Sequence, residues 1–564
     1  MSKKPLVECV PNFSEGRNRK VIDQITNEIS RQEGVKLLDV DPGAATNRTV
    51  VTFVGEPEPV LEAAFNAVKK ASELIDMSGH KGEHPRMGAT DVCPLIPVRD
   101  ISMEETAKLA AKLGKRVGEE LEIPVYLYEN AATRPERKNL ATVRSGEYEG
   151  LADKFKDPEW KPDFGPAKFN PRTGATAISA RDFLIAYNVN LNTTSVRRTN
   201  SVAFDVREKG RVKRKGDPIS GEIVRDDNGD PLRVPGTCKG VKAIGWYIDE
   251  YEIAQISMNI TDIRQTPLHK AFEECRKSAS KRGLRVTGSE LVGLVPKQVM
   301  IDAGKYYLTQ QKRSHGIPEE EIIHIAVKSM GLDEFYPFEL EKKIIEYQIE
   351  SLEPGPLASK NLREFANETA SESVAPGGGS IAAYVGSLGA SLATMVANLS
   401  SHKRGWDERW DFFSDWAVKG EKLKEELLGL VDEDTNAFNA IISAIRMPKS
   451  TEEEKTERAK AIDGATKNAI EVPFRTMQLA DEVFDVAEAM IREGNPTSVT
   501  DAGVGALCAR AASIAAYMNV VVNCKDLDDE AYVSNLMKKA DALKEKANKR
   551  EAALTKAVSE RLAK

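Results

Sequence analysis

Two of the six histidines in this chain lie within five positions of each other, at His80 and His84. Together with Glu83 they match the H-x-x-E-H pattern of one class of zinc metalloproteases. Two imidazoles at this spacing share one metal ion only when the segment is helical. Gly82 weakens a helix, and Pro85 moves the residue before it out of the helical region. The segment therefore predicts an extended loop without a metal, and a metalloprotease stays as an alternative.

An extended His84 with charged neighbours suits acid and base chemistry on an anionic substrate. A histidine can take a proton near neutral pH, and a carboxylate beside it can orient the ring. Arg86 offers a fork of donors that fits a carboxylate of a ligand. The alternative interpretation is a loop histidine that only satisfies backbone groups.

The overall composition narrows the classes of function. The chain has 564 residues and a formal net charge of −7, so several domains are expected and nucleic acid is not an expected partner. Its six cysteines are scattered without a C-x-x-C pair, which is typical of a reduced intracellular protein. No stretch has the pattern of a signal peptide or a membrane span. These features predict a cytoplasmic protein with no metal site and no membrane segment.

The order of expected strands and helices divides the chain into three parts. Residues 6–128 follow the order βαββαβ with a further helix and strand, and much of this order recurs in residues 183–294. After residue 355 strand patterns almost vanish and helical spacing dominates. We expect two α/β ferredoxin-like (βαββαβ) subdomains followed by an all-α helical domain. The expected boundaries are 1–184, 185–352, a linker at 353–360, and 361–564.

Two segments rich in glycine or proline offer free backbone amides to a ligand. Residues 162–176 disfavour a helix, and a plain linker between domains is their alternative role. Residues 375–380 precede a helix start, where free amides can bind an anion or a flat ligand. They lack the Lys-Ser/Thr of a phosphate-binding P-loop, so a nucleotide is not expected there. Residues 381–399 are apolar but rich in small side chains, which indicates a close-packed helix.

Motifs spread along nearly the whole chain resemble the formiminotransferase-cyclodeaminase family. In the α/β part they are LVECVPNFSEG (6–16), LDVD (38–41), TNRT (46–49), GEHPRMG (82–88), GWY (245–247), and LVGLVP (291–296) followed by Gln298. In the helical part they are the glycine-rich 375–380 segment, LVDED (430–434), GNP (494–496) and TDAG (500–503). The combination is specific because the motifs occur in order over both parts.

The resemblance implies two consecutive reactions of histidine breakdown. A formimino group passes from N-formimino-L-glutamate to tetrahydrofolate, and ring closure with loss of ammonia then gives 5,10-methenyltetrahydrofolate. His84 matches the family's catalytic histidine, and Asp41 is the candidate carboxylate that orients it. Asp434 matches the cyclodeaminase active-site position. Arg86 and Arg48 are the expected substrate-binding residues.

The resemblance also implies ligands and an assembly. Tetrahydrofolate is expected as a polyglutamylated co-substrate, with no metal, and a homo-oligomer built from dimers is expected as a ring. The expected folate-binding residues are Gly165, Pro166, Lys168, Phe169, Arg172, Gly174, Gly377, Gly378 and Gly379.

Two segments depart from the family pattern. Residues 209–238 look like an inserted hairpin, with an Asn-Gly turn and a basic run at its start that is typical of solvated surface. Residues 400–405 replace a more usual Thr-Tyr-Gly-basic pattern. A formiminotransferase whose helical domain serves only for assembly is therefore the alternative function.

Overall fold

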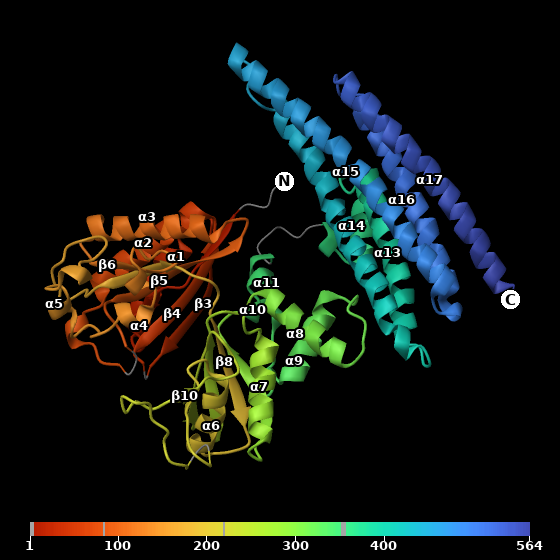
Figure 1. Cartoon of the computed structure of the whole chain (residues 1–564). Coiled ribbons are helices and arrows are strands. Elements are labelled where there is room, and N and C mark those ends of the chain that lie inside the picture. Colours follow the sequence, from red (N-terminus) through yellow and green to blue (C-terminus); the bar gives the residue numbers. More distant parts are fainter. Residues whose placement is uncertain (1–4, 45, 83–84, 218–219, 351–356, 564) are drawn as a thin grey trace. The chain divides into compact units, whose positions relative to one another are not determined.

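A computed structural model of the chain describes residues 5–44, 46–82, 85–217, 220–350 and 357–563. The described residues form two compact units (Figure 1). Unit 1 holds those of 1–299 and 330–352 and carries two β-sheets of four or more strands. Unit 2 holds those of 300–329 and 353–564 and is helical. At this level the prediction of α/β parts followed by an all-α part is confirmed.

Seven strands form the first sheet. They are β1 (Leu6–Cys9), β2 (Asn12–Phe13), β3 (Val35–Gly43), β4 (Arg48–Gly55), β5 (Thr90–Arg99), β6 (Val125–Glu129) and β7 (Thr176–Ala180). β4 lies between β3 and β1, β1 also pairs with β5, and these three pairings are antiparallel. Helices α1 (Arg19–Ser30) and α2 (Pro57–Leu74) connect these strands in the predicted order.

Helices α1, α2 and α3 (Met103–Glu120) pack next to one another against the first sheet (Figure 1). They do so because each carries one apolar face, which in α2 includes the buried Val60, Phe65 and Val68. The spacing of Ser102 and Glu105 predicts a capping box at the start of α3. In the structure the Ser102 hydroxyl accepts from the Glu105 amide and the Glu105 carboxylate accepts from the Ser102 amide.

The sequence predicts that residues 130–182 form a polar connector with one short helix, and strand β7 lies within this segment. It runs parallel to both β5 and β6 and fills the space between them, with every residue buried. The prediction of a continuous connector through residue 182 was wrong at this strand. The five residues Thr-Ala-Ile-Ser-Ala are short and mostly small, so their strand character depends on two neighbours that are distant in sequence. The rest of the connector contains only short helices: η2 (Pro135–Arg137), α4 (Leu140–Val143), α5 (Leu151–Lys154) and η3 (Pro158–Trp160).

Four strands form the second sheet, and they repeat the order of the first. The strands are β8 (Ile185–Leu191), β11 (Val241–Ile248), β12 (Ile253–Ile260) and β13 (Val286–Val292). Their spatial order β11-β12-β8-β13 is antiparallel throughout and corresponds to β3-β4-β1-β5. Helices α6 (Val196–Val206) and α7 (Leu268–Ser280) take the places of α1 and α2. The recurrence expected from the sequence is therefore present.

The segment at 209–238 forms a short hairpin in which β9 (Arg211–Val212) pairs with β10 (Arg233–Val234). Its basic residues mostly serve the hairpin itself. Arg211 pairs with Asp205, the Arg214 Nη1 donates to the Gly221 carbonyl at 2.7 Å, and the Lys215 ammonium lies 3.6 Å from Glu222. These contacts support the interpretation of the basic run as surface structure.

In unit 2, helical spacing in the sequence predicts helices over 362–369, 380–399, 408–447, 452–493, 504–522 and 530–562. The helices of the structure begin and end close to these positions. They are α12 (Leu362–Thr369), α13 (Gly378–Ser401), α14 (Trp410–Ile445), α15 (Glu452–Glu493), α16 (Val499–Cys524) and α17 (Glu530–Leu562). Shorter elements are η4 (Leu357–Ser359), η5 (Asp407–Arg409) and η6 (Pro496–Ser498). In the sequence, four helices follow β13 and precede α12: α8 (Lys297–Gln310) and α9 (Glu319–Met330), which belong mostly to unit 2, and α10 (Leu340–Lys343) and α11 (Ile345–Glu350), which belong to unit 1.

Small residues let α13 and α16 approach closely. A Cβ added to Gly389 would lie 2.9 Å from the Gly505 carbonyl oxygen, so a side chain there would push the helices apart. By length and composition α13 and the segment 496–524 could cross a membrane, but 61% of the apolar window of α13 is buried inside the structure. This packing agrees with the interpretation of 381–399 as a close-packed helix.

Glu8 on β1 is a buried carboxyl with a strongly shifted pKa. Its side chain is 4% exposed, and burial raises its pKa from 4.5 to about 7, with Arg181 opposing the shift and Glu346 adding to it. Because the folded state holds this proton more tightly than the unfolded state, the ionised carboxylate costs stability as the pH rises from 4.5 to 7. This loss of stability is absent below pH 4.5 and reaches its full size above about pH 7.

Replacing Glu8 by glutamine should therefore raise the free energy of unfolding by up to about 3 kcal/mol at pH 8 and leave it unchanged near pH 4.5. Urea unfolding of both proteins across this pH range measures the difference. Glu33→Gln, at an exposed turn, is the matched control and should show no such trend. A difference between the Glu8 variant and the wild type that is equal at all pH values would contradict the explanation.

Candidate active site

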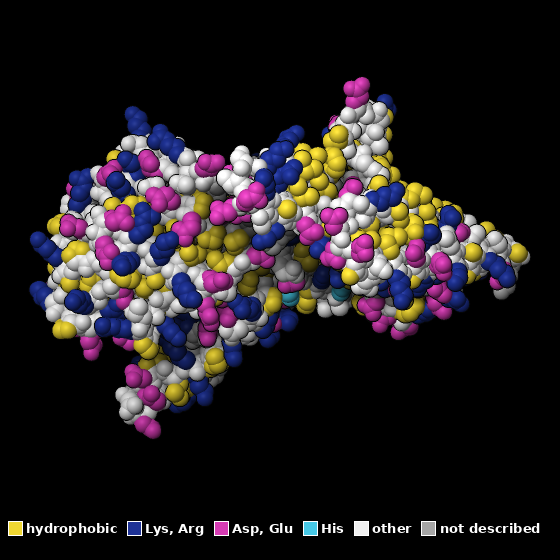
Figure 2. All heavy atoms as spheres, turned by 90° about the horizontal axis from the view of Figure 1, so that it is seen from above, with side chains coloured by type: hydrophobic (Ala, Val, Ile, Leu, Met, Phe, Trp, Pro, Cys, Tyr) yellow, Lys and Arg dark blue, Asp and Glu magenta, His cyan; other side chains and the backbone are white. Residues whose placement is uncertain are grey.

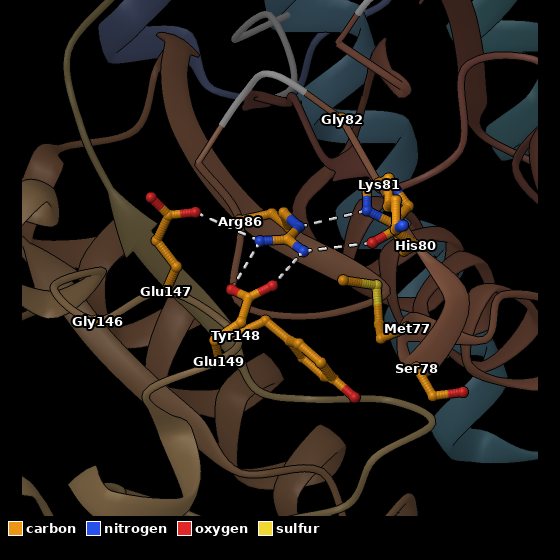
Figure 3. Close-up of a pocket in the computed structure, with 10 residues that line it drawn as sticks. All are labelled: Met77, Ser78, His80, Lys81, Gly82, Arg86, Gly146, Glu147, Tyr148 and Glu149. Carbon is orange, nitrogen blue, oxygen red and sulfur yellow. Dashed lines mark hydrogen bonds and ion pairs between the residues drawn. The ribbon is translucent and has the colours of Figure 1, made fainter.

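An open pocket of about 740 Å³ lies in unit 1 beside the loop that precedes β5 (Figure 3). Its described lining residues come from two segments, 77–86 and 146–149. They are Met77, Ser78, His80, Lys81, Gly82, Arg86, Gly146, Glu147, Tyr148 and Glu149. The backbone joins the two segments through a hydrogen bond of 2.8 Å from the Tyr148 amide to the Arg86 carbonyl. Part of the loop for which the sequence predicted acid and base chemistry therefore lines this pocket.

The guanidinium of Arg86 is the electrostatic centre of this pocket. Its Nη1 and Nη2 donate to the two carboxylate oxygens of Glu149 at 2.9 and 2.7 Å, and Nη1 also donates to Glu147 at 3.3 Å (Figure 3). The hydrogen bonds to Glu149 raise the Arg86 pKa, so the group stays charged. The bidentate geometry is the one expected for a ligand carboxylate, but here a side chain of the protein occupies it.

His80 holds Arg86 from the other side. The Arg86 Nε donates to His80 Nδ1 at 3.3 Å, so Nδ1 carries no proton in this arrangement. The other ring nitrogen, Nε2, lies 2.9 Å from the Asn47 carbonyl oxygen and donates to it. Both nitrogens of the neutral ring are thus used to position the arginine. Sequence reasoning considered His80 only as a metal ligand and missed this role.

His84 and Glu83 lie outside the described residues, so the role of His84 stays a prediction. The loop is anchored on both sides of them. Before them, the Asn47 Nδ2 donates to the Lys81 carbonyl at 3.1 Å, and a Cβ on Gly82 would lie 2.1 Å from the Thr46 carbonyl oxygen. After them, the Met87 amide donates to Asp91 Oδ1 at 2.9 Å.

Arg48 lies beneath this loop, in a buried cluster with Asp91. It pairs with Asp91, which is fully buried and also accepts from Arg144 Nη2 at 2.8 Å. Arg48 Nε donates to Asn12 Oδ1 at 3.0 Å, and burial lowers the Arg48 pKa while Asp91 opposes the shift. With these partners, Arg48 holds the base of the loop, and its predicted contact with substrate stays a prediction.

Asp41 lies near the exposed end of β3, opposite Val50 of β4. Asp41 is not among the described residues that line the pocket. The structure therefore leaves its predicted pairing with His84 as a hypothesis.

The 162–176 segment packs against the same pocket at only one of its ends. The ring of Phe169 lies against Tyr148 with 5.4 Å between centroids, and the Arg172 carbonyl accepts from the Met77 amide at 3.0 Å. Gly174 has a φ of +64°, and a Cβ there would lie 2.2 Å from the Met87 carbonyl oxygen, so only glycine fits. The pocket is therefore held in shape by contacts from Phe169, Arg172 and Gly174, which are not among its described lining residues.

The other predicted residues of this segment lie elsewhere. Gly165 has a φ of +79° and packs on the Ile123 carbonyl at the end of α3. Pro166 and Lys168 are exposed, and neither lines the described part of the pocket.

In unit 2, the Asp434 carboxylate of α14 lies against the start of α13. Its Oδ2 accepts from the Ser380 hydroxyl at 3.0 Å, and a Cβ added to Gly379 would lie 2.1 Å from its Oδ1. Burial raises the pKa of this carboxyl, and the hydrogen bonds from Ser380 only partly offset that effect.

Gly377 caps α13, and Gly378 lies near Asn519 of α16. The structure thus joins two motifs that are more than fifty residues apart in the sequence. A carboxyl with a raised pKa can donate a proton to a leaving nitrogen.

Comparison with known proteins gives matches over both parts of the chain. Three sequence families match the chain: the N-terminal subdomain of the formiminotransferase domain over residues 6–181, the formiminotransferase domain over 186–350, and formiminotransferase-cyclodeaminase over 361–542. Formimidoyltransferase-cyclodeaminase of Mus musculus is 43% identical over 550 residues, which are 97% of this chain and 98% of the relative. This chain belongs to the formiminotransferase-cyclodeaminase family.

Two shorter relatives of this chain each have a single enzyme activity in their names. Glutamate formimidoyltransferase of Thermoplasma acidophilum is 45% identical over 305 residues, covering 54% of this chain and 92% of the relative. Methenyltetrahydrofolate cyclohydrolase of Methylorubrum extorquens is 37% identical over 185 residues, covering 33% of this chain and 89% of the relative.

The second sheet of this family member carries a polar face that the sequence analysis missed. Gln255 Nε2 donates to Asn190 Oδ1 at 2.8 Å and to Glu290 Oε2 at 3.3 Å, and the exposed Trp246 donates to Gln255 at 3.4 Å. Asn188 and Asn190 alternate along β8, so a period-two pattern of amides within an apolar strand was the available signal.

The described residues of this family member contain no group of three or more His, Cys, Asp or Glu side chains arranged to hold a metal ion. His80 has extended backbone angles, φ −73° and ψ 131°, which do not continue a helix toward residue 84. The helical geometry needed by an H-x-x-E-H zinc site is therefore missing at its first residue.

Proposed function

We propose that this protein is a bifunctional folate enzyme. It transfers the formimino group of N-formimino-L-glutamate to tetrahydrofolate, giving L-glutamate and 5-formiminotetrahydrofolate, and then cyclises this product to 5,10-methenyltetrahydrofolate with release of ammonia. The observation that carries the proposal is the match of a relative with both activities in its name to 97% of the chain. Its place in histidine degradation is part of the same proposal.

The transfer step requires removal of a proton from N5 of tetrahydrofolate as it attacks the amidine carbon. We assign this role to His84, with Asp41 as the orienting carboxylate. Arg86 is supported as a substrate-binding residue by its fork of donors within an open pocket. The substrate's carboxylate must replace Glu149 there, because Glu149 occupies both donors.

The cyclisation step requires a proton on the departing nitrogen as N10 attacks the formimino carbon. Asp434 is the proposed acid, supported by the raised pKa of its carboxyl and by its contacts with Gly379 and Ser380. The close approach of Gly379 leaves the amides at the start of α13 beside the carboxyl, where they can accommodate a flat ring.

Tetrahydrofolate is proposed as a polyglutamylated co-substrate. The amide and carboxylate face of the second sheet, beside Trp246, offers acceptors and a ring surface to a pteridine whose edge carries N–H donors. The basic run near 207–215 supports tail binding only through its exposed lysines, since Arg207 and Arg214 bind backbone carbonyls of the same segment and Arg211 pairs with Asp205 of α6.

The strand order shared by both sheets supports the ferredoxin-like description of the two subdomains. We also propose a cytoplasmic homo-oligomer built from dimers. Figure 2 shows hydrophobic side chains gathered in patches over the helices of unit 2. The exposed apolar residues of α13 and α16 are Leu388, Met395, Leu399, Val504, Leu507, Met518 and Val522. A second copy of the chain would remove such a surface from water.

If Glu149 competes with substrate for Arg86, Glu149→Gln should lower the KM for N-formimino-L-glutamate about three- to fivefold with little change in kcat. The size follows from the modest strength of an ion pair whose carboxylate is largely exposed. Initial rates of transfer measure it. Glu147→Gln, which removes one longer contact, is the control and should change KM less. A higher KM in Glu149→Gln would mean that Glu149 instead orients Arg86 for the substrate.

One assay separates this proposal from a transferase with a non-catalytic helical domain. The purified chain is given N-formimino-L-glutamate and tetrahydrofolate, and L-glutamate, ammonia and methenyltetrahydrofolate are measured together. Equal amounts of all three support both activities. Glutamate without ammonia would leave only the transferase.

A further inference from the structure

A second pocket, of about 480 Å³, lies within unit 2 and has no role in either proposed reaction. It is an open pocket lined by the 311–318 loop and helices α9, α13 and α14. Its lining residues on α13 begin at Ser391, about 16 Å along the helix from Ser380, so it is separate from the Asp434 centre. Its volume lies in the range of pockets that bind small molecules.

Asn398, which lines this pocket, carries an unsatisfied acceptor. Asn398 Nδ2 donates to the Gly316 carbonyl at 2.7 Å, which fixes the orientation of the amide, because a flip would place two oxygens together. Its Oδ1 is buried and has no hydrogen-bond partner. A buried acceptor without a donor is destabilising, and such a group calls for an explanation such as a bound ligand.

The loop that carries Gly316 is held firmly, so the pocket is preformed. The His315 amide donates to the Ser414 hydroxyl at 3.0 Å, and a Cβ on Gly316 would lie 2.2 Å from the backbone of Ala417. The loop backbone therefore needs little rearrangement to bind a ligand, and only neighbouring side chains must move to open the buried Asn398 Oδ1 to it.

Charges of both signs line the pocket. The Arg313 guanidinium has one contact with Glu321 at 3.5 Å, which is longer than a strong charge-assisted hydrogen bond and leaves donors for another carboxylate. Glu421 pairs with Lys424 at 2.5 Å and retains acceptor capacity, since a carboxylate has about four acceptor positions. Burial and Arg313 lower the pKa of His402, which favours its neutral form. The polar groups thus suit a ligand with one negative and one positive end.

Ser391 and Thr394 add hydroxyl groups to the lining, and the other lining side chains are apolar: Ile317, Pro318, Met395 and Leu399. Such a wall accepts an aliphatic group and excludes a charged one.

We propose that this pocket binds a free α-amino acid with an aliphatic side chain, with its carboxylate on Arg313 and its ammonium on Asn398 Oδ1 and Glu421. The ammonium supplies the donor that Asn398 lacks, and the side chain lies against Ile317 and Met395. The site is distinct from both proposed reactions, so an amino acid bound there is an effector or a stabilising ligand and not a substrate.

Calorimetric titration of L-leucine into the full-length protein tests the proposal. We expect saturable binding at one site per chain. 3-Methylbutylamine, which lacks the carboxylate, and 4-methylpentanoate, which lacks the ammonium, should each bind at least tenfold more weakly, since a hydrogen bond to a charged group contributes more than 1.4 kcal/mol. No saturable heat with L-leucine, L-valine or L-methionine would overturn the proposal, as would equal binding of the amine alone.

Variants locate the binding site. Arg313→Gln should weaken L-leucine binding at least tenfold, and Asn398→Ala should also weaken it. Arg492→Gln, which removes an exposed ion pair within α15, is the matched control and should bind as the wild type does. Unchanged affinity in Arg313→Gln would exclude this pocket. The comparison of the three ligands on the wild type remains decisive if a variant fails to fold.

Discussion

Replacing His84 by alanine is expected to lower the rate of formimino transfer by about 10²- to 10⁴-fold, the usual contribution of a general base. The loop around it is anchored by Asn47 before and by Asp91 after, so the substitution should change the chemistry and not the fold. 5-Formiminotetrahydrofolate supplied directly should still be cyclised at the wild-type rate. Initial rates of glutamate release and of methenyltetrahydrofolate formation measure the two activities separately.

His324→Ala is the control for this prediction, because His324 lies exposed on α9 and lines neither pocket among the described residues. It should leave both activities unchanged. Near-normal transfer by His84→Ala at saturating substrate would remove His84 as the base, and the acid and base roles would then need other groups of the same pocket.

Asp434→Asn is expected to abolish most cyclisation, again by about 10²-fold or more, while transfer continues. An amide keeps the size of the side chain and can keep its hydrogen bond from Ser380, but its N–H groups are too weakly acidic to protonate a leaving nitrogen. The formimino intermediate should accumulate and ammonia release should stop. Because burial raises the pKa of this carboxyl, wild-type cyclisation should also fall as the pH rises through that pKa.

Glu433→Gln provides the matched control on the adjacent position of α14, where the side chain is exposed. It should leave both reactions unchanged. Methenyltetrahydrofolate formed at the wild-type rate by Asp434→Asn would show that another group supplies the proton. Gly379→Ala tests the same centre sterically, since its Cβ would meet the carboxylate, and it should impair cyclisation alone.

The sequence alone determined those parts of the fold whose causes are local. The ranges predicted for α12, α15 and α17 agree with the structure because each helix starts at a side-chain cap: Asn361, Thr451 and Asp529 accept from amides of the first turn. The family motifs likewise indicated both activities. Such signals act over a few residues, so they can be read without knowing which segments meet.

Only the tertiary structure decided what depends on distant neighbours. β7 is a strand because it pairs with β5 and β6, although its own residues have weak preferences. Glu149 occupies the donors of Arg86 from 63 positions away, and Gly379 meets Asp434 across two helices. The sequence supplied these groups but not their partners, because a hydrogen bond or an ion pair depends on distances that chain folding sets.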